Sequence, residues 1–98
     1  MTTPTIANVR AAFERYVELT KEFVPEGFVL GLAEGSKTYG NAYRLFMTGE
    51  RAEDGSYPNG SGHWGPPIGP DFLGMTKTEA FNTLVTINRT IMDLKGST

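Results

Sequence analysis

The sequence predicts an α+β domain in which two amphipathic helices flank an antiparallel β-hairpin and a long irregular segment. Apolar residues recur at helical spacing near both ends of the chain, and two apolar runs separated by turn residues lie near its middle. Glycine and proline supply 10 of the 22 residues from 49 to 70. Because 98 residues suffice for one domain with a modest core, we expect residues 1–98 to fold as a unit.

The first helix is expected over residues 4–24. Thr3 is placed to cap it, Pro4 suits the first helical position, and the turn residues 25–27 end it. Its apolar residues fall on one side, which predicts packing against the hairpin. The opposite side carries charged residues at i,i+4 spacing: Glu14, Glu18 and Glu22.

The hairpin is expected from strands at residues 28–34 and 41–48, joined by the turn-rich residues 35–40. Two strands alone form a layer that is only marginally stable in water. Either part of residues 62–73 adds a third short strand, or a second copy of the chain completes the sheet. The rest of 49–70 is predicted to be a long Gly/Pro-rich loop.

The second helix is expected over residues 76–95, because Thr76 and Glu79 form a capping box and apolar residues then cover about half of the circumference. Asn88 falls inside this apolar arc. A buried amide costs about 1–3 kcal/mol unless it is hydrogen-bonded, so Asn88 is either a satisfied core residue or part of an interface. The polar side of this helix has few charges, which favours contact with a partner. The predicted interface residues are Asn82, Thr86, Asn88 and Arg89.

Composition excludes several classes of protein. The chain has no cysteine, which excludes disulfides and thiolate metal sites. Its net charge of -2 argues against nucleic-acid binding and against docking on anionic membranes. The start of the chain lacks the features of a secretory signal, and no run of about 18 apolar residues occurs. We therefore expect a cytoplasmic protein that does not span a membrane.

Cations and aromatic residues interleave around the hairpin, and the long loop adds a histidine and a tryptophan. Such a mixture can hold a phosphate and stack a base. One hypothesis is therefore a pocket for a small nucleotide-like anion; the alternative is ordinary strand aromatics with surface cations. The candidate ligand-binding residues are Lys37, Tyr39, Tyr43, Arg44, His63 and Trp64.

No residue pattern predicts a catalytic centre, a metal site or a cofactor. Residues 60–65 match G-x-G-x-x-G, but a turn precedes them and Pro66-Pro67 follows, whereas the dinucleotide motif needs a strand and then a helix. His63, with a carboxylate from residues 50–54, could serve a hydrolase, but nothing in the sequence defines their geometry.

Three segments of the chain resemble small proteins of actinobacterial phages that have no assigned activity. They are residues 41–45, 72–81 and 87–91. This resemblance implies an accessory protein that acts in the host cytoplasm by binding a host factor. The element order also resembles that of double-stranded-RNA-binding domains, but the second helix lacks their basic start.

Three functions follow as hypotheses, in order of preference. The first is a non-enzymatic, homodimeric accessory protein of the phage type that binds and modulates a host protein. The second is a small-ligand binder that sequesters a nucleotide-like anion. The third is a small hydrolase that uses His63.

Overall fold

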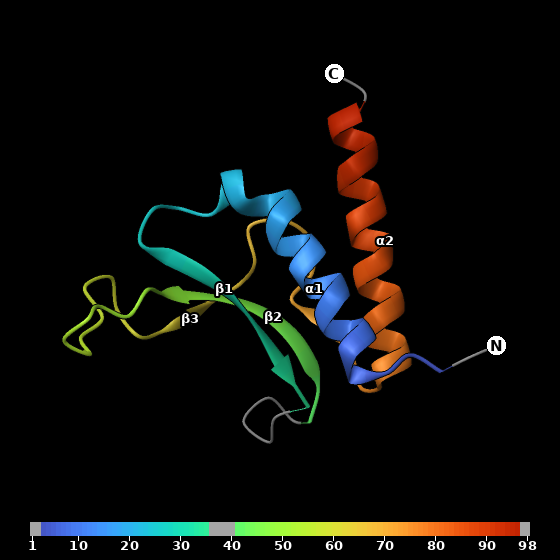
Figure 1. Cartoon of the computed structure of the whole chain (residues 1–98), viewed down its shortest axis with the longest axis horizontal. Coiled ribbons are helices and arrows are strands. Elements are labelled where there is room, and N and C mark those ends of the chain that lie inside the picture. Colours follow the sequence, from blue (N-terminus) through green and yellow to red (C-terminus); the bar gives the residue numbers. More distant parts are fainter. Residues whose placement is uncertain (1–2, 36–40, 97–98) are drawn as a thin grey trace.

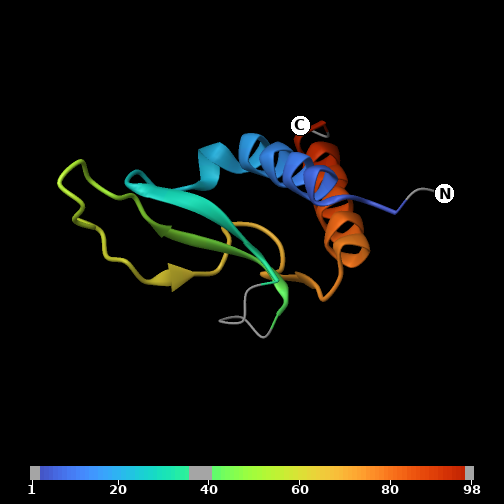
Figure 2. The same cartoon turned by 60° about the horizontal axis from the view of Figure 1, so that its bottom comes forward.

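A computed structural model describes residues 3–35 and 41–96 and confirms the α+β class. The elements follow the order helix, short 3-10 helix, two long strands, two short strands and helix. Figure 1 colours the chain in this order, from blue to red. The molecule is thin, with extents of 46 × 40 × 19 Å. In both views α1 and α2 lie toward one end of the sheet, and the segment that carries β3 projects beyond them (Figures 1 and 2).

Helix α1 spans Ile6–Thr20 and continues as a short 3-10 helix, η1, over Lys21–Phe23. It begins two residues later than predicted, because Thr5 rather than Thr3 is the cap. The Thr5 hydroxyl accepts a hydrogen bond from the Asn8 backbone N–H (3.2 Å), and the Asn8 side-chain oxygen accepts one from the Thr5 N–H (2.9 Å). This reciprocal pair satisfies two backbone donors at the helix start, which a cap at Thr3 would leave open.

The sheet has four strands and is centred on β2. Strand β1 (Phe28–Glu34) pairs antiparallel with β2 (Tyr43–Gly49), as predicted for the hairpin. The other edge of β2 carries two short antiparallel strands, β3 (His63–Trp64) near its end and β4 (Phe72–Gly74) near its start. The expectation that residues 62–73 supply a third strand is therefore confirmed, and β4 adds a fourth.

Helix α2 spans Lys77–Gly96, with Thr76 in the predicted capping position. The Glu79 backbone N–H donates to the Thr76 hydroxyl (3.1 Å), while the Glu79 carboxylate accepts from the Met75 N–H (3.3 Å). Two residues of the predicted apolar arc are exposed near the end of the helix, Met92 at 46% and Leu94 at 62%.

The core lies where the two helices meet β2 and β4. The Tyr16 hydroxyl reaches across it and donates to the Ile68 carbonyl (2.6 Å), which holds the irregular segment against α1. Burial raises the pKa of Tyr16, and this hydrogen bond partly offsets the effect. The buried apolar cluster comprises Val9, Ala12, Tyr16, Tyr43, Leu45, Leu73, Ala80, Leu84, Ile87 and Ile91.

Candidate binding surface

A groove of about 480 Å³ runs between α1 and α2. Apart from Asn88, its lining residues on α2 lie on a different stripe from the buried residues of that helix, so the groove opens to the surface of the helix pair. Its apolar lining joins small residues of α1 to larger side chains of α2. The charged residues at its margin are exposed. The apolar lining is Ala11, Ala12, Phe81, Val85 and Met92, and the polar lining is Asn8, Arg15, Asn88, Arg89 and Asp93.

Asn88 joins the groove to the interior. The side chain is 7% exposed, and its Nδ2 donates to the Ala12 carbonyl of α1 (3.0 Å). Its Oδ1 is buried and accepts no hydrogen bond within the part of the chain that the structure describes. The amide therefore ties the two helices together with half of its hydrogen-bonding capacity, at the cost of an unsatisfied acceptor. The core interpretation of Asn88 therefore holds for its Nδ2 but not for its Oδ1, and the interface interpretation stays a prediction.

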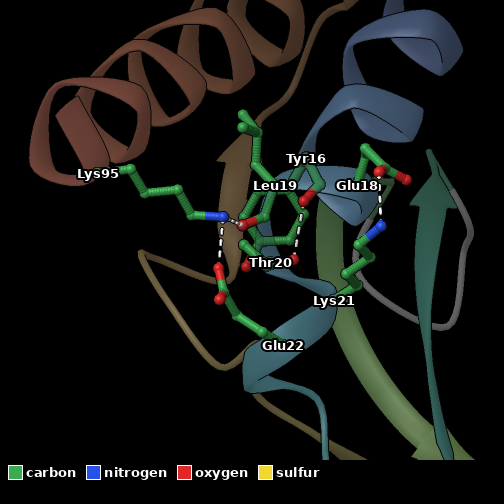
Figure 3. Close-up of polar contacts among 7 residues, drawn as sticks. All are labelled: Tyr16, Glu18, Leu19, Thr20, Lys21, Glu22 and Lys95. Carbon is green, nitrogen blue, oxygen red and sulfur yellow. Dashed lines mark hydrogen bonds and ion pairs between the residues drawn. The ribbon is translucent and has the colours of Figure 1, made fainter.

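The helix pair that forms the groove is held at its far end by Lys95. The Lys95 ammonium donates to the Leu19 carbonyl at the end of α1 (2.5 Å) and pairs with Glu22 (2.5 Å), as Figure 3 shows. A cation at this position also interacts favourably with the negative end of the α1 dipole. Nearer the groove, Arg15 of α1 contacts the Met92 sulfur of α2 (3.8 Å). The walls of the groove are thus joined by polar contacts at three places along the helices.

The structure divides the predicted interface residues between this groove and the surface beside it. Asn88 and Arg89 line the groove. Asn82 and Thr86 are exposed on the adjacent stripe of α2. Sequence analysis missed the α1 side of the groove, although the adjacent small residues Ala11 and Ala12 are the available signal, because small side chains let two helices approach closely. It placed the apolar residues of the α2 side in one broad arc but did not identify the helix that lies beside them.

The predicted ligand-binding residues do not share a pocket. Lys37 and Tyr39 lie outside the described residues. Tyr43 is 9% exposed and belongs to the core, so it faces the helices. Arg44 follows it on the same strand and therefore points to the opposite face of the sheet. There Arg44 pairs with Asp71 (3.2 Å) and lies over the Phe72 ring (5.4 Å).

His63 and Trp64 also lie on opposite faces. His63 is opposite Thr48 at the far end of β2 from Arg44, and its ring stacks on Phe46 (4.4 Å between centroids). Trp64 is opposite Met47 and meets the Phe28 ring edge-on (5.5 Å), on the face that the helices cover elsewhere. Neighbouring residues of a strand alternate between faces, which separates this pair despite its adjacency in sequence.

The acidic residues at 50–54 form a turn. The Asp54 carboxylate accepts from the Ser56 hydroxyl (2.6 Å) and from the Ser56 backbone N–H (2.9 Å). These bonds, the hydroxyl first, lower the pKa of Asp54, which favours a structural anion over a proton donor. No group of three or more potential metal ligands occurs in residues 3–35 and 41–96.

A scan against protein-family models and searches of curated proteins and of solved structures each found no match. Within the described ranges, neither helix combines the length and the apolar character needed to cross a membrane.

Proposed function

We propose that the chain is a non-enzymatic binding protein, of the kind that phages use as accessory proteins, and that it binds and modulates a host protein through the α1/α2 groove. The observation that carries this proposal is the groove itself. It combines an apolar lining with an exposed charged margin. Hydrogen bonds connect the two helices that form its walls.

The groove fits an apolar partner segment better than a small charged ligand. Phe81, Val85 and Met92 present apolar surface along the length of α2. Arg15 and Arg89 flank this surface and can pair with acidic residues of the partner at the rim. A partner helix laid along such a groove would bury apolar residues at i, i+3 or i+4, and i+7.

The alternative functions gain less support from the geometry. An anion-binding pocket would need Arg44, His63, Tyr43 and Trp64 on one face, whereas two of them lie on each face of the sheet. A hydrolase would need an activated acid or base, whereas the pKa of Asp54 is lowered within a turn.

The proposal is tested by capture from an actinobacterial host lysate with two matched lysine variants. Val85→Lys places a charge in the apolar lining, whereas Thr90→Lys adds the same charge to an exposed position on the far side of α2. We expect the wild-type chain and Thr90→Lys to retain the same host protein, and Val85→Lys to lose it while keeping its circular dichroism spectrum. Equal retention by both variants would place the partner elsewhere and overturn the assignment of the groove.

A further inference from the structure

Strand β1 leaves one long edge of the sheet without a partner strand. Within the described residues β1 pairs only with β2, whereas the opposite edge of β2 carries β3 and β4. Those outer strands have two and three residues, but β1 has seven. Proteins usually protect long edges with proline, lysine, a bulge or a covering element. The β1 sequence, FVLGLAE, contains no proline or lysine, and its one charged residue is at the end.

The hydrogen-bond pattern shows which backbone groups face outward. Glu50 N donates to Gly27 O (2.8 Å) before β1, and Gly35 N donates to Ala42 O (3.2 Å) after it. Hydrogen-bonded and non-hydrogen-bonded positions alternate in an antiparallel pair. The odd-numbered residues of β1 therefore bond to β2, and the N–H and C=O groups of its even-numbered residues point away from the sheet. The backbone of another extended strand can form hydrogen bonds with these outward-pointing groups.

We infer that a second copy of this chain adds its own β1 to this edge, antiparallel and with a two-fold axis at Gly31. In this register Leu30 lies opposite Leu32 of the second copy, and both residues have outward-pointing backbone groups. The two symmetric Leu30/Leu32 pairs exchange four hydrogen bonds, and the Glu34 N–H of each copy reaches the Phe28 carbonyl of the other, which gives about six bonds in all. The Phe28 N–H is not needed, since it already donates to Pro25 O (3.1 Å).

Side chains on both faces favour this register. Beside the start of β1 is a groove of about 390 Å³ whose walls include Val17 and Val24, and Leu32 of the second copy would enter it next to Leu30. On the other face the Phe46 ring covers Gly31 so closely that a Cβ there would lie 2.3 Å from it. The glycine at the axis thus lets the two strands pair while each Phe46 ring stays in place. Val29, which is 42% exposed, gains a cross-strand neighbour in Ala33 of the second copy.

This dimer surface is separate from the α1/α2 groove, because the two share no lining residue. A homodimer formed through β1 therefore leaves both grooves between the helices open to a host protein. The dimer and the proposed host-binding function can fail independently of each other.

Two measurements on the full chain test the pairing. The first is sedimentation equilibrium, where we expect twice the chain mass of 10.7 kDa for the wild type. Leu32→Pro removes an N–H that points away from β2, so the pairing within the chain stays intact, and we expect the monomer mass. Met75→Lys, at a 51% exposed residue outside β1, is the control and should remain dimeric.

The second measurement is disulfide trapping, which the absence of native cysteine makes selective. In the proposed register Val29 faces Ala33 of the second copy, at a non-hydrogen-bonded pair within disulfide distance. We expect an oxidised equimolar mixture of Val29→Cys and Ala33→Cys to form a covalent heterodimer, and neither variant alone to cross-link. This readout does not depend on whether Leu32→Pro folds.

A monomeric wild type at millimolar concentration would overturn the inference and leave the β1 edge to a foreign strand or to solvent. A dimer that persists in Leu32→Pro, or that yields no heterodisulfide in the mixture, would also overturn it, because the contact would then lie on another surface.

Discussion

Replacing Asn88 by leucine should stabilise the protein, although most substitutions at buried positions destabilise. The substitution keeps the branched shape and the number of side-chain heavy atoms at a position that is 7% exposed, although the two methyl groups of leucine need more space than the amide. It removes the unsatisfied Oδ1, whose burial costs about 1–3 kcal/mol. It also removes the bond from Nδ2 to the Ala12 carbonyl, worth about 1 kcal/mol net. Ala12 is internal to α1, so its carbonyl keeps its intrahelical partner.

The balance of these two contributions favours leucine by up to about 2 kcal/mol, and the added apolar contacts act in the same direction. For a domain of this size, each kcal/mol of added stability corresponds to a rise in Tm of roughly 4–8 °C. Thermal and urea unfolding followed by circular dichroism measure it, and an unchanged m-value would show that both proteins unfold from equally compact native states. A loss of more than 1 kcal/mol would refute the reasoning, since it would mean that Oδ1 is satisfied, for example by a buried water.

Asn88→Asp is the matched contrast because it keeps the shape and adds a charge. Burial raises the pKa of the introduced carboxyl above its value in the unfolded chain. The variant should therefore be most stable below the unfolded-state pKa and lose stability as the pH rises through the folded-state pKa. At neutral pH we expect a loss of about 3 kcal/mol or more relative to wild type, because no described residue donates a hydrogen bond to the buried oxygen at this position.

Two further substitutions test the contacts that hold the helices in place. Tyr16→Phe removes the hydroxyl that bonds to the Ile68 carbonyl and should lower the free energy of unfolding by about 1 kcal/mol in urea titrations. Hydrogen exchange around Ile68 should then become faster, and unchanged protection there would contradict the anchoring role. Lys95→Met removes the cation from the end of α1 and should cost about 0.5–1 kcal/mol, with the difference shrinking in high salt. A salt-independent difference would instead indicate lost packing of the lysine stem.

Local signals account for how well the elements were predicted. The proposed strand at 28–34 coincides with β1, and Thr76 and Glu79 place the start of α2 correctly. The helix at the start of the chain was misplaced because two threonines, Thr3 and Thr5, compete as caps. Only Thr5 has a side chain three residues later, Asn8, that completes the box.

The candidate site was predicted less well, for a reason that lies in strand geometry. Tyr43 and Arg44 were grouped because they are neighbours in sequence, but neighbours in a strand point to opposite faces. The groove was missed for a related reason, since four of its ten lining residues come from α1, which is far from α2 in the sequence. A composition pattern within one helix cannot reveal which other helix lies beside it.

The sequence by itself determined the class of the fold, the helices and long strands, and the exceptional character of Asn88, because capping, periodicity and turn residues act over a few positions. Only the tertiary structure decided that β3 and β4 complete one edge of the sheet while, among the described residues, β1 pairs with β2 alone. It also decided that the Asn88 amide binds α1 through one atom and leaves the other unsatisfied. Both outcomes depend on contacts between distant segments, and their energies arise only when the helices and the sheet pack together.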